Sequence, residues 1–161
     1  MTRGAPIRFS VATPADVDEL VSDVRPEDAD EILMAGMCSV EEAIRFSVDG
    51  GIASYSSRTG NDLLCLFGVF QPQGDVALIW EIGTSKVRRN AKAFLRSTPH
   101  MLRLCMDSAP MVSTFVNYLP DTYATYRKWL EKRAGAVFDD EAFPSRTGAM
   151  FRRFAITRKG A

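Results

Sequence analysis

The chain has 161 residues, and its 20 basic and 20 acidic side chains cancel to a formal net charge of zero. A neutral chain argues against a nucleic-acid-binding protein. The single histidine and three cysteines without paired spacing argue against a metal site and a disulfide framework. No apolar run approaches the roughly 18 residues of a membrane span, and the first residues lack the apolar core of a signal peptide. We therefore expect a single domain over residues 1–161 in a reducing cytoplasm, with no membrane span and no nucleic-acid partner.

The first third of the chain predicts one strand and three helices. Apolar and polar residues alternate over residues 7–11, which is typical of a half-buried strand. A Thr-Pro pair then predicts a helix over residues 14–23. A second helical segment starts at Pro26, and the Ser-Val-Glu-Glu run from Ser39 is a capping box for a third helix, which ends at residues 50–51.

The rest of the chain alternates between strand and helix patterns. Three apolar runs, at residues 52–57, 63–70 and 76–82, are separated by turn-forming residues, which predicts an antiparallel meander. A helical stripe from residue 91 persists across Pro99, so we expect a long helix that is kinked or broken there. The C-terminal part predicts a strand at 112–118, a helix at 122–133 closed by Gly135, and two strands near 136–138 and 149–157.

Charge is distributed unevenly along this neutral chain. Residues 82–106 carry six basic side chains and no carboxylate, whereas residues 16–42 carry ten carboxylates and one basic residue, Arg25. The basic stretch begins where a helix follows a strand, and free backbone N–H groups and the helix dipole favour an anion there. This predicts a phosphate site, although a basic face for a macromolecule or plain solvated charge fits the same pattern. The acidic stretch fits solvated helix faces, or a surface for a cationic acceptor or partner.

The order of these elements resembles a known family. It is similar to the GNAT acyltransferase fold, an α/β fold with a mixed, mostly antiparallel sheet of about six to seven strands and helices on both faces. Four segments look like GNAT-like proteins of tailed bacteriophages, some of which are internal virion proteins. These segments are Ile82-Gly83-Thr84, Phe94-Leu95-Arg96, Asn117-Tyr118 and the Trp129-Leu130 pair that precedes Gly135.

The resemblance implies acetyl-CoA, or coenzyme A, bound where the fourth and fifth strands splay apart. It implies Glu81 as the base that takes a proton from the acceptor amine, and Tyr126 as the nearest candidate for the acid that protonates the leaving thiolate. The residues that it places around the cofactor are Ile82, Gly83 and Thr84 for the acetyl-pantetheine arm, Lys86, Arg88, Arg89, Asn90 and Lys92 for the phosphates, and Asn117 at the splay.

Two features of the GNAT pattern are missing. GNAT enzymes carry glycines in the pyrophosphate turn, because glycine lets backbone N–H groups close on the phosphates, whereas this chain has basic side chains from Lys86 to Arg89. Arginine side chains could replace those contacts, since a guanidinium binds phosphate in a bidentate manner. The place of the usual leaving-group tyrosine is held by Glu131.

Two functions follow as expectations. The first is acetyl-CoA-dependent N-acetyl transfer by a phage-encoded enzyme to an amine on a small molecule or a protein. The second is a catalytically inactive GNAT-like phage protein that acts by binding, either in a virion or on a host bacterial enzyme. Under the second function Glu81 is an outward-facing strand carboxylate, and Tyr126 packs in the core or a groove.

Overall fold

The computed structural model describes residues 5–159. The strands are β1 (Ile7–Val11), β2 (Gly51–Thr59), β3 (Asp62–Phe70), β4 (Val76–Gly83), β5 (Thr114–Pro120), β6 (Val137–Phe138), β7 (Phe143–Pro144) and β8 (Met150–Thr157). The helices are α1 (Pro14–Ser22), α2 (Pro26–Ala35), α3 (Val40–Asp49), the 3₁₀ helix η1 (Ser85–Asn90), α4 (Ala91–Ser108), α5 (Ala124–Trp129) and the π-helical turn η2 (Leu130–Ala134).

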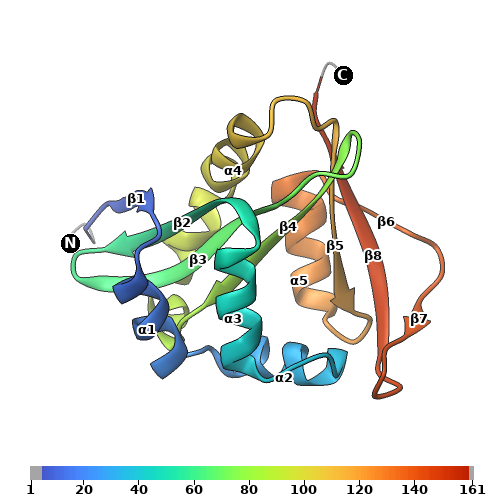
Figure 1. Ribbon diagram of the computed structural model, residues 1–161, viewed down its shortest axis with the longest axis horizontal. Helices are drawn as coiled ribbons and strands as arrows, with labels where there is room; N and C mark the ends of the chain where they lie inside the picture. The colour runs from blue at the N-terminus through green and yellow to red at the C-terminus, as the bar shows by residue number, and fades with distance from the viewer. Residues whose placement is uncertain (1–4, 160–161) are drawn as a thin grey trace.

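These strands form one mixed sheet with helices on both faces (Figure 1). The strand order is β1-β2-β3-β4-β5-β8-β6, with β7 also paired to β8. Among the residues described, β4 and β5 run parallel and all other pairs of strands run antiparallel. The expected mostly antiparallel α/β sheet is therefore confirmed. Within residues 5–159 there are eight strands rather than about six to seven, because the two-residue strand β7 adds to those expected, which include β6 near residues 136–138.

Local sequence signals determine most helix boundaries. Thr13 and Ser39 each accept a hydrogen bond from the backbone N–H three residues later, and the acidic side chain at that position accepts one from the N–H of the cap residue, so both capping boxes form. Gly36 and Gly135 end their helical segments with φ angles of 72° and 67°, a conformation that favours glycine. The predicted helix at 122–133 is observed as α5 followed by η2.

The expected long helix is observed as α4, which continues through Pro99, so of the two expected alternatives, a kink or a break, the break is wrong. A proline removes one backbone donor, so the carbonyl of Leu95 loses its helical partner. Leu95 and Pro99 are both exposed, so water can bind that carbonyl. The buried face of α4, which includes Phe94, Met101 and Cys105, keeps the helix packed on the sheet on either side of the proline.

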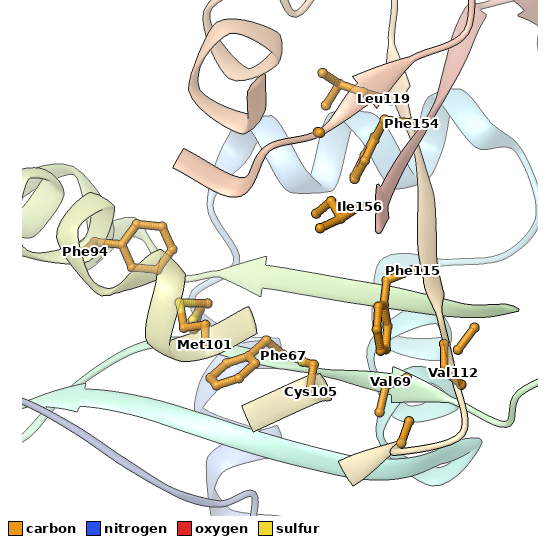
Figure 2. Packing of buried hydrophobic residues seen from close by; sticks show 14 of the residues in the cluster. Phe67, Val69, Phe94, Met101, Cys105, Val112, Phe115, Leu119, Phe154 and Ile156 are labelled. Atoms are coloured by element: carbon orange, nitrogen blue, oxygen red, sulfur yellow. The ribbon is translucent and has the colours of Figure 1, made fainter. Parts of the chain in front are cut away.

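Two apolar cores lie on opposite faces of the sheet. Figure 2 shows part of the core under α4, where Phe94 and Met101 face Phe154 and Ile156 on β8, with Phe67 of β3 below them. The second core joins α1 and α3 to the other face of the sheet through Leu20, Ile44, Leu66, Trp80 and Ile82. None of the helices within residues 5–159 combines the length and apolar composition needed to cross a lipid bilayer.

Candidate functional site

The sheet opens between its two parallel strands. Val76–Leu78 of β4 pair with Thr114–Val116 of β5, and beyond these residues the strands separate. Asn117 lies where the pairing ends, and its Nδ2 donates a hydrogen bond to the carbonyl oxygen of Ile79 at 2.6 Å. The side chain therefore bridges the strands at the start of the opening.

The edge of β4 that faces this opening is partly covered by the N-terminal part of the chain. The N–H of Gly83 donates to Asp28 Oδ2 at 2.6 Å, and the carbonyl of Gly83 accepts from the N–H of Arg25 at 2.8 Å. Because alternate residues of a strand direct their backbone groups to the same side, the main chain of Glu81 faces the opening between Ile79 and Gly83. The uncovered part of the edge is thus centred on Glu81.

A buried guanidinium joins this edge to α2. Arg25 donates to both carboxylate oxygens of Asp28, at 3.0 and 2.9 Å, and to Glu81 Oε2 at 3.2 Å, and only 7% of the residue is exposed. Its guanidinium carbon also lies 5.6 Å from the ring centre of Tyr126 on α5. Burial alone would lower the pKa of Arg25, but Glu81 and Asp28 outweigh burial and raise that pKa. Arg25 is therefore a permanent cation that orients Glu81.

Three carboxyl groups near Arg25, those of Asp28, Glu81 and Glu31, have pKa values that burial raises. Burial raises the pKa of Glu81 to about 7, with Asp28 adding to the rise and Arg25 opposing it. Burial likewise raises the pKa of Glu31 to about 8, and the charges of Asp28 and Glu81 add to this rise. One arginine thus faces three carboxyl groups, and a group with a pKa near 7 can accept and release a proton at neutral pH.

Glu31→Gln is expected to stabilise the protein at pH 8 by about 4 kcal/mol and at pH 5 by about 1 kcal/mol or less. The folded pKa of Glu31 lies above its ordinary value of 4.5, so the stability that its protonated form provides is present below 4.5 and is lost as the pH rises toward 8. Urea denaturation of both proteins at the two pH values measures this difference. A gain of equal size at pH 5 would contradict it.

Two cavities meet at Glu81. An outer groove of about 460 Å³ lies between the start of α4, the start of α2 and α5, and Arg88, Phe94 and Leu95 are among its lining residues. An inner cavity of about 130 Å³ lies between α4, α5 and the sheet. Four residues line both spaces, and they are Arg25, Glu81, Tyr126 and Trp129.

Four residues that line the inner cavity have a buried polar atom without a hydrogen-bond partner among residues 5–159. One is Trp80, which belongs to the core under α1 and α3, and the other three atoms are Glu81 Oε1, Trp129 Nε1 and Thr98 Oγ1. Buried polar atoms in native proteins are nearly always paired, so each such atom calls for an explanation. An acceptor, an indole donor and a hydroxyl around one cavity mark it as a space that a ligand or water completes.

The predicted phosphate ligands do not all point into the groove. Arg88 lines it, whereas Lys86 Nζ lies 3.2 Å from Glu19 Oε1 and Arg89 Nη2 lies 2.5 Å from Asp62 Oδ2. Lys92 is exposed on the first turn of α4, and Asn90 Nδ2 donates to the carbonyl of Lys86 at 3.0 Å. The basic side chains are therefore spread over several directions.

The main chain after β4 is also engaged. The N–H of Thr84 donates to Leu64, and those of Ser85, Lys86 and Val87 donate to Asp23 or to Thr84 itself. Among the predicted residues of the pantetheine arm, Ile82 packs its side chain in the core under α1 and α3, and Gly83 and Thr84 are buried. Anion binding at η1 therefore depends on side chains rather than on a fan of backbone donors.

The structure brings Glu81, Asn117 and Tyr126 around the inner cavity and Arg88 around the groove. Arg25, Asp28 and Glu31 also line the inner cavity, and none of them was predicted as a site residue from the sequence. One signal was available, because Arg25 is the single cation within a stretch of ten carboxylates. A lone cation in such a stretch is a candidate for a buried ion pair.

Comparison with solved structures identifies the fold. The aminoglycoside 6'-acetyltransferase type Ii matches with a TM-score of 0.66 at 13% identity, over 93% of this chain and 96% of that chain. An acetyltransferase of Bacillus subtilis in complex with CoA matches with a TM-score of 0.64 at 11% identity, over 95% and 98%. The chain has the GNAT acetyltransferase fold.

A third neighbour of this fold is the ribosomal-protein-S18-alanine N-acetyltransferase from Escherichia coli, with a TM-score of 0.62 at 12% identity, over 96% of each chain. Neither a protein-family model nor a curated protein sequence matches the chain. The structural similarity shows the GNAT fold. At identities this low, the chemistry of this chain depends on its own residues.

Proposed function

We propose that the protein is an acyl-coenzyme A-dependent N-acyltransferase, with acetyl-CoA as the donor that the GNAT resemblance implies. The observation that supports this most directly is Glu81, a carboxyl group with a pKa near 7 at the uncovered edge of the splayed strand β4, where the outer groove meets the inner cavity. We also propose a phage origin, which the sequence resemblance supports, and an amine as the acceptor, which the acidic helix α2 supports.

Glu81 serves as the base in this proposal. Its deprotonated carboxylate takes one proton from the ammonium group of the acceptor, directly or through a water molecule, and the free amine then attacks the acyl carbon. The bond from that carbon to sulfur breaks as the bond to nitrogen forms, and the second proton of the nitrogen goes to the departing thiolate. Arg25 holds the carboxylate toward the opening, because its Nη2 donates to Glu81 Oε2.

The leaving thiolate needs a proton donor nearby. Burial raises the pKa of Tyr126, so its hydroxyl stays protonated at neutral pH, and its ring lines both spaces. We assign this role to Tyr126, which gives its hydroxyl proton to the thiolate and takes the second proton of the nitrogen in its place.

The groove residues fit the arm and phosphates of coenzyme A, which supplies an activated acyl thioester when bound. Phe94, Leu95 and Trp129 give the groove apolar walls, and the unpaired Nε1 of Trp129 can donate to an amide carbonyl. Arg88 supplies a guanidinium for a phosphate at the same groove. Asn90 and Lys92 follow Arg88 along η1 and α4, but neither lines the groove, so Arg88 is the phosphate ligand that the geometry supports best.

Arg88→Ala is expected to weaken binding of acetyl-CoA about tenfold or more, because a charge-assisted contact to phosphate is lost. Arg89→Ala is the matched control. Its side chain is turned to Asp62 and is 63% exposed, so its loss should change the affinity by about twofold or less. Isothermal titration calorimetry of the three proteins measures both effects. Equal losses in the two variants would contradict the assignment of Arg88, and no heat at near-millimolar ligand would contradict the proposed function.

A second function, binding without catalysis, is favoured by one set of observations. Lys86 and Arg89 form ion pairs within the chain, and the N–H groups from Gly83 to Val87 have partners of their own. A GNAT-like phage protein that binds a host enzyme or a virion component needs no open phosphate site. The calorimetric result for acetyl-CoA decides between the two functions.

A further inference from the structure

The inner cavity extends the proposed site beyond the place where Glu81 acts. It lies between α4, α5 and the sheet, and its volume of about 130 Å³ is close to the roughly 150 Å³ of an engineered apolar cavity that binds benzene. An acetyl group, with one methyl beyond its carbonyl, would leave most of this space unfilled.

Arg25, Asp28, Glu31 and Glu81 line one part of the inner cavity, and the part formed by β3, α4 and β8 is hydrocarbon and sulfur apart from Thr98. Phe67, Met101, Leu102, Cys105 and Ile156 contribute to it from β3, α4 and β8. Figure 2 shows Phe67, Met101 and Cys105 on one side and Ile156 on the other, facing the region between α4 and β8. An ammonium group would lose its hydration among these side chains, whereas an alkyl chain gains free energy there. The cavity therefore suits the apolar part of a substrate.

The position of Glu81 decides which substrate that is. Glu81, Tyr126 and Trp129 line the outer groove and the inner cavity alike, so an acyl carbon beside Glu81 has the groove on one side and the cavity on the other. The coenzyme arm fits the groove with Arg88. We propose that the inner cavity receives the acyl group of the donor, and that the site prefers acyl chains of about four to six carbons to acetyl. This inference rests on the proposed acyltransferase function.

The test is a titration of the full chain with a series of donors, using coenzyme A, acetyl-CoA, butyryl-CoA and hexanoyl-CoA. Burying one methylene group tightens binding about fourfold, so butyryl-CoA should bind about 15-fold more tightly than acetyl-CoA. If butyryl-CoA binds no more tightly than acetyl-CoA while coenzyme A itself binds, the inference is wrong and the proposed function stands. If coenzyme A and all its thioesters fail to bind, both proposals are wrong.

A pair of variants on one helix locates the acyl group. Leu102 and Leu104 are both half-buried on α4, but Leu102 lines the inner cavity and Leu104 does not. Leu102→Phe should abolish the advantage of butyryl-CoA over acetyl-CoA and keep the affinity for coenzyme A within about twofold. Leu104→Phe should keep the 15-fold or so advantage. Loss of the advantage in both variants, with unchanged thermal unfolding, would place the acyl group elsewhere and overturn the inference.

Discussion

Replacing Arg25 by methionine is expected to lower the free energy of unfolding by about 3–5 kcal/mol at pH 7. The guanidinium contacts Asp28 and Glu81 in a region where Arg25 itself is 7% exposed, so its removal leaves two buried carboxyl groups without their counter-ion. Urea denaturation followed by circular dichroism measures the loss. The loss should shrink as the pH falls toward 4, because the carboxyl groups are then neutral and no longer need a cation.

Arg45→Met is the control for this prediction. Arg45 also contacts two carboxylates, Asp18 at 3.1 Å and Glu41 at 2.9 Å, but its side chain is 46% exposed. Exposed pairs contribute little, so this variant should change the free energy of unfolding by about 0.5 kcal/mol or less. If Arg25→Met costs no more than Arg45→Met, the buried ion cluster does not hold α2 against β4.

Elements with a local signal could be predicted from the sequence. The strand expected at residues 76–82 is β4 with one residue more, and the capping box at Ser39 starts α3. Both depend on residues within a few positions of each other, and this is why their boundaries are close to those observed. The resemblance to the GNAT fold implied that the fourth and fifth strands are neighbours that splay apart, and the register shows that β4 and β5 pair in parallel over three residues each.

Other elements depend on contacts that no local pattern encodes. The strand β7 forms because Phe143 and Pro144 pair with Phe151 and Met150 of β8, and an isolated pair of residues has no strand period. The 3₁₀ helix η1 occupies the place where the sequence suggested a loop and a first helical turn. Thr84 starts it by accepting from the N–H of Lys86, which uses a backbone donor that a phosphate would otherwise have needed.

The site shows the same division between local and distant information. Glu81 could be chosen because it lies near the end of a predicted strand before a basic turn. Its partner Arg25 is 56 residues away in the sequence, and Glu19, which pairs with Lys86, is 67 residues from that lysine. The sequence therefore predicted six available cations, whereas the fold pairs two of them, Lys86 and Arg89, with carboxylates. The roles proposed for Glu81, Tyr126 and the phosphate ligands stay predictions until they are measured.

Glu81→Gln is expected to lower the acyl transfer rate by about 10²-fold or more, because the amide cannot take a proton from the acceptor. For the unmodified protein, the rate at low substrate should rise with pH and level off above about 7, since the carboxyl group of Glu81 acts only when deprotonated. Release of free thiol from acetyl-CoA and butyryl-CoA measures this rate, with spermidine, kanamycin and an alanine-terminated peptide as test acceptors.

A control variant and an unfolding measurement separate the loss of the base in Glu81→Gln from a loss of folding. Glu41→Gln is the matched control, since Glu41 is an exposed residue of α3 that pairs with Arg45, and its rate and pH profile should match those of the unmodified protein. Thermal unfolding of Glu81→Gln separates a lost base from a lost fold. If Glu81→Gln keeps both its rate and the rise below pH 7, another group removes the proton. Glu31 is then the residue to replace next, because its carboxyl group lines the same cavity and has a pKa of about 8.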